Sequence, residues 1–309
     1  MKITLRPLLF VVLCMSFASV NAQVWKSSRW EKGLKEKYDA HIDVVYSRVD
    51  SFDNKLDFYL PKDAGELRPA LIWIHGGGWG RLSKDSVSGQ LVPYLEAGWV
   101  VFNVDYRLTP QARAPAAVID CRCALHWVFD HAGEFRVDTK KIVVSGSSAG
   151  GHLALITGML PGNNPFERSC AGDKEVGVAA IVNFYGITDV VDLLDRANRR
   201  GYAVKWLGDT PDREEIARSV SPLTYVRKEL PPIFTVHGDA DPTVPYEHAV
   251  RLHKALDDAG VPNELLTVPG GKHGKFEKEE NVRILRAVAA FLKKHTIVTG
   301  EGKTIEGFE

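Results

Sequence analysis

The sequence predicts an α/β fold, with a mostly parallel central sheet, helices on both faces and a small helical excursion at one end. Three observations support this. Short β-rich runs alternate with helical patterns between residues 40 and 294, no repeat or Pro/Gly/Ser-rich linker interrupts them, and a polar stretch at 186–230 departs from the alternation. Strands that alternate with helices form parallel sheets covered on both faces. A length of 309 residues fits one large domain or two small ones.

The composition excludes several classes of protein. The chain has 39 basic and 39 acidic residues, and 45% of its residues are hydrophobic. A neutral charge balance leaves no electrostatic signature of nucleic-acid binding. No run approaches the roughly 18 apolar residues of a membrane span. The chain is therefore expected to form a globular domain with a sizeable core, and its function must be inferred from motifs.

The first 22 residues have the order of features found in a signal peptide. Lys2 and Arg6 precede an apolar stretch at 8–15, and the small residues Val20 and Ala22 occupy the positions that signal peptidase selects. A buried N-terminal strand or helix is the alternative. We expect export by a Sec-type route, to the periplasm or the medium. The mature chain would then hold a catalytic domain at 23–294 and a polar tail at 295–309.

The expected strands are short runs rich in β-branched and aromatic residues. They lie at 42–48, 56–60, 70–75, 100–105, 141–145, 178–184, 233–237 and 264–268. The first two form a hairpin-like pair. Because ligands bind at the carboxyl ends of the strands in open α/β sheets, the residues that directly follow each strand are the candidates for chemistry.

Helices are expected where apolar residues recur every three or four positions. Such patterns begin near Ala117, Ala249 and Val282, and the second ends before Gly260 and Pro262. The stretch 186–230 contains irregular helical pieces, which we expect to cover one end of the sheet.

Removal of the signal peptide would leave Cys121, Cys123 and Cys170. An odd number leaves at least one thiol unpaired or paired between chains. Cys121 and Cys123 are two positions apart in a helical pattern, so their side chains do not face each other. We expect the cysteines to behave as small buried hydrophobic residues. Their spacing matches no zinc site.

The most specific motif is Gly146-Ser147-Ser148-Ala149-Gly150, which follows an apolar strand and precedes a helical run. This G-x-S-x-G pattern, in a strand–turn–helix context, holds a serine at the apex of a tight turn. The helix N-terminus beside it favours a developing negative charge. An ordinary Gly/Ser turn is the alternative. We predict that Ser148 is a nucleophile.

A serine nucleophile needs a base, and the base needs an acid that orients it. Asp241 and His273 each follow a predicted strand, in the chain order serine, acid, histidine. Asp239 is the competing acid, and we expect it to stabilise the turn instead. His152 is expected to pack behind the nucleophile. We predict a catalytic triad of Ser148, Asp241 and His273.

A glycine-rich loop, His75-Gly76-Gly77-Gly78-Trp79, follows the strand at 70–75. Glycines let the backbone approach a substrate and present N–H groups to it. A flexible turn is the alternative. We predict an oxyanion hole formed by the N–H groups of Gly77, Gly78 and Ala149.

Two tryptophans are candidates for substrate contact. Trp79 ends the glycine loop, and Trp206 lies in the excursion at 186–230. Aromatic faces suit sugar rings and aryl acids. The alternative for each is that it fills the core.

Together these segments resemble the α/β-hydrolase superfamily, and within it the hormone-sensitive-lipase-like esterases. The similarity is strongest to bacterial bifunctional acetyl-xylan and feruloyl esterases. It covers about residues 42–294 and rests on HGGGW at 75–79, DYRL at 105–108, GSSAG at 146–150, SPLTYV at 221–226, HGDADPTVP at 237–245 and GGKHG at 270–274.

The resemblance implies an α/β-hydrolase fold and a serine esterase that needs no metal or organic cofactor. It also implies that Tyr106 and Arg107 brace the oxyanion loop. Ser147 stands where relatives often carry an acidic residue, which affects the pocket floor but not the chemistry. The expected substrate is an ester, with acylated plant polysaccharide favoured. A general short-chain carboxylesterase or lipase is the alternative, followed by a non-catalytic binding protein. The sequence does not fix the oligomeric state.

Overall fold

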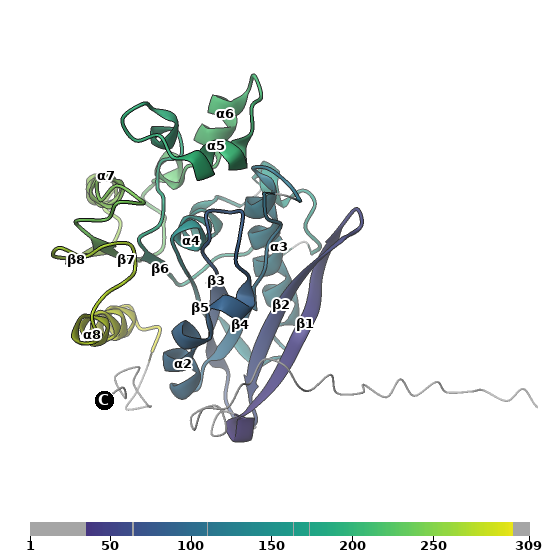
Figure 1. Ribbon diagram of the computed structural model, residues 1–309. Coiled ribbons are helices and arrows are strands. Elements are labelled where there is room, and N and C mark those ends of the chain that lie inside the picture. The colour runs from purple at the N-terminus through teal and green to yellow at the C-terminus, as the bar shows by residue number, and fades with distance from the viewer. Residues whose placement is uncertain (1–34, 64, 110, 163, 173, 299–309) are drawn as a thin grey trace, which may run out of the picture.

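The computed structural model describes residues 35–298, apart from residues 64, 110, 163 and 173 (Figure 1). The expected signal peptide at 1–22 therefore lies outside the described residues, as does most of the tail at 295–309. The domain limits stay a prediction.

A single eight-stranded sheet organises the described part of the chain, in the order β1-β2-β4-β3-β5-β6-β7-β8. Strands β3 to β8 pair in parallel, whereas β1 pairs antiparallel with β2 and β2 with β4. All eight expected strands are present, including the initial hairpin. Their bounds are β1 Tyr38–Val49, β2 Phe52–Pro61, β3 Arg68–Ile74, β4 Val100–Val104, β5 Val137–Ser147, β6 Ala180–Phe184, β7 Ile233–Gly238 and β8 Asn263–Val268.

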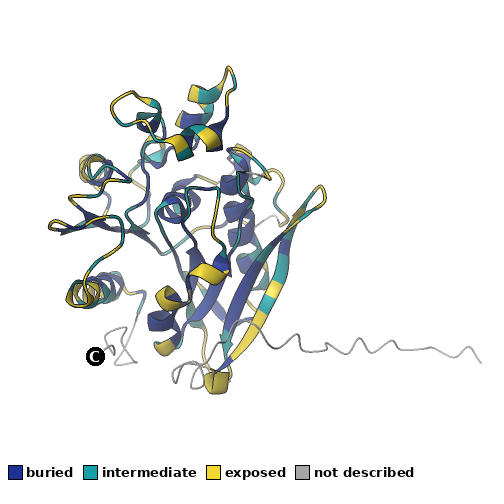
Figure 2. Ribbon diagram, in the orientation of Figure 1, coloured by how far each residue is buried: buried dark blue, intermediate teal, exposed yellow. Residues whose placement is uncertain are grey.

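The central strands are buried on both faces, as Figure 2 shows by their dark colour. Strand β3, with the sequence RPALIWI, is a nearly continuous apolar run in which Ile72 packs into one core and Leu71 and Trp73 into the other. Such runs are typical of parallel strands that have helices on each side. The prediction of a mostly parallel α/β sheet is confirmed.

The helices divide between the two faces. Helices α3, α4 and α7 contribute buried residues to one core, and α2 and α8 to the other. Their bounds are α2 Ser88–Glu96, α3 Ala116–His131, α4 Ala149–Met159, α7 Glu247–Asp258 and α8 Lys278–Lys294, with short 3-10 helices η1 Lys84–Ser86 and η2 Pro165–Glu167. Among the described helices, none combines the length and apolar character that crossing a bilayer requires.

The stretch 186–230 is a set of short helical pieces, as expected. It contains η3 Asp192–Leu194, α5 Gly201–Leu207, α6 Arg213–Ser219 and η4 Pro222–Tyr225. Figure 1 shows α5 and α6 together at one end of the sheet, above α4. This excursion therefore covers the end of the sheet at which the parallel strands finish.

The cysteines differ from our expectation. Cys123 and Cys170 form a disulfide between α3 and the segment after η2, whereas Cys121 is a buried free thiol. The prediction that all three act as small buried hydrophobic residues is wrong for Cys123 and Cys170. It failed because residues 47 positions apart cannot be paired from spacing alone.

Candidate active site

Ser148 stands at the junction of β5 and α4 in a strained backbone conformation. Its φ of 57° and ψ of −122° lie in a region that residues with a side chain rarely adopt. The turn is fixed on both sides, since Ser148 N–H donates to the Phe184 carbonyl at 2.9 Å and His152 N–H donates to the Ser148 carbonyl at 3.0 Å. The hydroxyl is thereby presented at the carboxyl end of a central strand.

The glycines beside this turn are required by close approach of the backbone. A Cβ added to Gly146 would lie 2.5 Å from the Ile74 carbonyl oxygen, and one on Gly150 would lie 2.1 Å from the same oxygen. Real Cβ atoms do not approach backbone oxygens this closely. Gly146 and Gly150 of the G-x-S-x-G pattern are therefore required because the turn packs closely against the end of β3.

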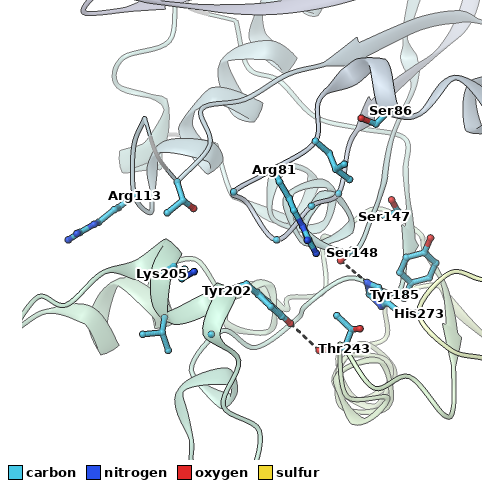
Figure 3. A pocket seen from close by; sticks show the side chains of 18 of the residues that line it. Arg81, Ser86, Arg113, Ser147, Ser148, Tyr185, Tyr202, Lys205, Thr243 and His273 are labelled. Carbon is cyan, nitrogen blue, oxygen red and sulfur yellow. Dashed lines mark hydrogen bonds between the residues drawn. The ribbon is translucent and has the colours of Figure 1, made fainter.

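His273 connects Ser148 to Asp241. Its Nε2 lies 2.8 Å from Ser148 Oγ, and its Nδ1 lies 2.6 Å from Asp241 Oδ2 (Figure 3 shows the contact with Ser148). A carboxylate at Nδ1 favours the tautomer with the proton on Nδ1, which leaves Nε2 free to accept the serine proton. The structure thus brings together the three residues predicted from three separate motifs.

The Asp241 carboxylate is held ionised by its surroundings. Burial alone would raise the pKa of Asp241, but hydrogen bonding with His237 and His273 and with the Thr243 N–H outweighs burial and lowers the pKa well below its usual value. Asp241 Oδ1 also accepts a hydrogen bond from the Val244 N–H at 3.1 Å. The side chain is therefore anchored as an acceptor.

Asp239 has a different environment. Its Oδ1 accepts a hydrogen bond from the Gly270 N–H at 2.6 Å and so ties the loop after β7 to the loop after β8. His237, at the end of β7, lies 3.3 Å from Asp241 Oδ2 and 3.1 Å from the Val244 carbonyl. Both residues organise the acid loop.

The glycine loop presents N–H groups beside the serine. Gly77 and Gly78 have φ values of 110° and 61°. A Cβ on Gly77 would lie 2.0 Å from the Arg81 carbonyl oxygen, so the turn admits no side chain there. Within the described part of the chain, no group accepts a hydrogen bond from the N–H groups of Gly77, Gly78 or Ala149. Three unpaired donors are thus available to an oxyanion.

Tyr106 and Arg107 support this loop to different degrees. The Tyr106 hydroxyl donates to the His75 carbonyl at 3.1 Å, and its ring stacks on the His75 ring at 4.4 Å. Arg107 instead pairs with Asp120 of α3, with Nη2 to Oδ1 at 2.8 Å. Tyr106 therefore contacts the loop directly, whereas Arg107 fixes its own segment to α3.

Trp79 and Trp206 do not face the cavity, so the expectation that they contact substrate is wrong. Both are 0% exposed and stack on each other at 4.0 Å. Trp79 Nε1–H donates to His152 Nδ1, and the other ring nitrogen of His152 lies 2.7 Å from the Val220 carbonyl. A positive φ of 57° at Trp79 turns its side chain inward. The pair anchors the excursion to α4 through His152, which lies on the first turn of the helix behind Ser148.

A cavity of about 1470 Å³ opens above Ser148 and His273. Its wall includes Tyr185 and Tyr202, which our sequence analysis missed. The Tyr185 ring contacts the His273 ring at 4.8 Å, and burial raises the pKa of Tyr185 to about 12, so its hydroxyl stays protonated. Tyr185 directly follows β6, so it could have been identified by the rule that residues directly after strands are candidates for the site.

Tyr202 comes from α5 and packs against Gly78, where an added Cβ would lie 3.3 Å from the Tyr202 Cβ. Its hydroxyl donates to the Thr243 carbonyl at 3.1 Å (Figure 3). Tyr202 therefore joins the oxyanion loop to the acid loop. Among the described residues, no group of three or more His, Cys, Asp or Glu side chains has the arrangement of a metal site.

Comparisons with known proteins agree with this architecture. The family model BD-FAE matches residues 56–256. The esterase LipQ of Mycobacterium tuberculosis is 29% identical over 272 residues, which cover 84% of this chain and 64% of LipQ. Esterase LipC of the same organism is 30% identical, over 77% of this chain and 62% of LipC. The matches thus span less than two thirds of those two relatives.

Solved structures are similar over nearly their whole length. The propionate-bound esterase Est2 of Thermogutta terrifontis has a TM-score of 0.71 and 31% identity, covering 85% of this chain and 97% of Est2. A truncated carbohydrate esterase from gut microbiota has a TM-score of 0.69 and 27% identity, covering 84% of this chain and 97% of that one.

Proposed function

The chain belongs to the BD-FAE family of α/β-hydrolase serine esterases, and from this we propose that it hydrolyses short acyl esters of carbohydrates, releasing acetyl or feruloyl groups from plant polysaccharide. The observation that carries the proposal is the hydrogen-bonded series from Ser148 through His273 to Asp241 at the base of a wide cavity.

In the proposed mechanism Ser148 Oγ attacks the ester carbonyl while His273 Nε2 accepts its proton. Asp241 holds the histidine tautomer and stabilises the imidazolium. The N–H groups of Gly77, Gly78 and Ala149 donate to the tetrahedral oxyanion. His273 then protonates the leaving alcohol, and water hydrolyses the acyl-enzyme by the same steps in reverse.

The character of the cavity supports a carbohydrate ester over a fatty ester. Among the described residues that line it, the aliphatic side chains are Leu82, Val87 and Val204, and the remainder are polar, charged, tyrosine or glycine. Its volume exceeds the roughly 300–1,000 Å³ of a typical small-molecule pocket. A wide cavity with few aliphatic side chains suits a hydroxylated chain, and Tyr185 and Tyr202 provide the aromatic surface that Trp79 and Trp206 do not.

The relatives support a short acyl group. Est2 of Thermogutta terrifontis has been solved with propionate and with butyrate bound, and another structural relative is named a carbohydrate esterase. A general short-chain carboxylesterase is the second candidate, because the propionate and butyrate bound to Est2 are equally consistent with it.

The decisive assay compares acetylated xylan and methyl ferulate with a long-chain triglyceride at one enzyme concentration. We expect release of acetate, and of ferulate if the acyl pocket accepts it, with negligible release of fatty acid. Fast triglyceride hydrolysis without acetate release would contradict the proposal and indicate a lipase. Activity on p-nitrophenyl acetate alone would favour the general carboxylesterase.

Labelling of the nucleophile separates an enzyme from a binding protein. Est2 is phosphorylated by paraoxon. We expect paraoxon to add one diethylphosphoryl group to Ser148, located by peptide mass spectrometry. Ser148→Ala should remove the label and Ser147→Ala should keep it, because Ser148 is the serine whose hydroxyl lies within hydrogen-bond distance of His273. Labelling of both variants, or of neither the native chain nor Ser147→Ala, would contradict the assignment.

We also propose that the protein is exported, to the periplasm or the medium. The disulfide between Cys123 and Cys170 supports this, because such bonds persist in oxidising compartments. Mass spectrometry of the exported chain should find Gln23 at its N-terminus, and an intact Met1 on a cytoplasmic protein would contradict export.

A further inference from the structure

The outer part of the cavity concentrates positive charge. Four of its cationic side chains make no ion pair within the described residues: Arg81, Arg113, Arg199 and Lys205. A fifth, Arg213, pairs with Asp209 at 3.3 Å. Asp209 is the only acidic side chain among the described residues that line the cavity. The chain as a whole carries equal numbers of acidic and basic residues, so this excess of one sign is local.

The fold brings these charges together from separate segments. Arg81 follows the glycine loop, Arg113 precedes α3, and Lys205 lies on α5. Arg113 reaches the end of α5 because Gly208 has no side chain there, and an added Cβ would lie 2.5 Å from Arg113 Nη1. Gly208 has a φ of 81°, which independently favours glycine at this position.

Two of these cationic residues, Arg113 and Lys205, are set apart from the reacting atoms. In Figure 3, Ser148, His273 and Tyr185 lie at one side of the view, Arg113 and Lys205 lie at the other, and Arg81 and Tyr202 project into the space between. A group bound by Arg113 and Lys205 is therefore remote from the scissile carbonyl and belongs to the alcohol portion of the ester.

Grouped cations without partners repel each other, whereas an anion that binds among them gains from all of them. A cleft lined by one sign of charge raises the local concentration of oppositely charged substrates. Arginine in particular matches the planar, two-oxygen geometry of carboxylates and related oxyanions.

We propose that the preferred substrate carries an anionic substituent on its sugar portion, as in an O-acylated uronic acid or an acylated, sulfated sugar. This rests on the proposed function and specifies its substrate class. Arg113 and Lys205 bind the anionic substituent, and the acyl group lies toward Ser148.

The test compares substrates that carry an anionic or a neutral group at C6 of the sugar. The methyl glycosides of O-acetylated glucuronic acid and of O-acetylated glucuronamide share the same ring and acetyl group, and an O-acetylated glucose 6-sulfate distinguishes sulfate from carboxylate. Acetate release gives kcat/KM for each. We expect a higher kcat/KM for at least one anionic substrate than for the amide.

The double variant Arg113→Gln/Lys205→Gln should lower the ratio of anionic to neutral kcat/KM by about three- to twentyfold, the effect of two exposed ion pairs. The matched control Lys140→Gln/Lys228→Gln removes the same charge from two exposed residues that do not line the cavity, and should leave the ratio unchanged. The preference of the native enzyme should also shrink from about 0.01 M to 1 M NaCl, as the screening length falls from about 30 Å to about 3 Å.

Equal kcat/KM for the anionic and neutral glycosides, or the same ratio in the double variant and the control, would overturn the inference while the proposed function stands. Absence of acetate release from every glycoside, together with inactivity on acetylated xylan, would instead overturn the proposed function.

Discussion

Ser148 and His273 share one proton in the proposed mechanism, so their contributions to catalysis are not independent. Ser148→Ala and His273→Ala should each lower kcat by about 10⁴- to 10⁶-fold, and the double variant should be little worse than either single variant. Steady-state hydrolysis of p-nitrophenyl acetate measures this. Near-native activity of Ser148→Ala, or losses that multiply in the double variant, would contradict the assignment.

Asp241 and Asp239 have different hydrogen-bond partners, His273 for Asp241 and the Gly270 N–H for Asp239. Asp241→Asn leaves an amide that can donate to His273 Nδ1 and so favours the wrong tautomer, which should lower kcat by about 10⁴-fold. Asp239→Asn removes a charge from a loop contact with Gly270 and should lower kcat by less than about tenfold. The reverse order of the two kcat values would move the acid role to Asp239.

Among the site residues, those whose position follows from chain order and from the ends of the strands could be predicted from the sequence. Ser148, Asp241 and His273 each follow a strand, and the carboxyl ends of parallel strands meet at one edge of the sheet, so their convergence is predictable. The direction of the Trp79 side chain was not predictable, because it depends on a positive φ that a Gly-Gly-Gly-Trp run does not specify. The cationic part of the cavity was missed because Arg81, Arg113 and Lys205 are far apart in the chain.

At the scale of elements, the Cys123–Cys170 disulfide ties α3 to the connection that leads to β6. The two cysteines are 47 positions apart in the sequence. A disulfide that closes a loop of this length is expected to contribute about 3–4 kcal/mol to the free energy of unfolding. Cys123→Ser should lose about this amount in urea unfolding without reductant.

A reductant separates the two kinds of cysteine. Dithiothreitol should lower the stability of the native chain toward that of Cys123→Ser, and Cys121→Ala should retain the sensitivity to reductant because Cys121 is a free thiol. Equal stability of the native chain with and without reductant would argue against the disulfide.

The strands were more predictable than the helices. Each strand is a short run of β-branched or aromatic residues between polar turns, and all eight were found from that signal. No apolar pattern was identified for helix α2, whose sequence SGQLVPYLE contains a glycine and Pro93. Packing of Leu91 and Leu95 against the sheet outweighs these weak local preferences.

At the scale of the whole molecule, buried histidines make stability depend on pH. Burial lowers the pKa of His152 to about 4 from its ordinary 6.5, and burial likewise lowers that of His248 to about 4, although Asp192 beside it opposes the shift. Between these values the unfolded chain binds protons that the folded chain does not, so stability rises with pH from about 4 to 6.5 and falls on acidification.

Each of these two histidines should remove about 2–3 kcal/mol from the free energy of unfolding between pH 7 and pH 4.5. The lowered pKa of Asp241 acts in a more acidic range, because its stabilisation is lost as pH falls from the ordinary value of 3.8 through the lowered value. Urea unfolding at the two pH values tests this. His152→Gln should show a shallower dependence on pH, and an unchanged dependence would contradict the role given to His152.

Helix α5 has one set of residues whose identity is constrained by packing and another whose identity can vary. Its buried residues Ala203, Trp206 and Leu207 attach it to the body of the enzyme, while Tyr202 and Lys205 face the cavity. Substitutions on the cavity side can accumulate over evolutionary time without loosening the attachment. A designer seeking a new substrate range can therefore randomise Val204 and Lys205 while keeping the tryptophan pair as a fixed scaffold.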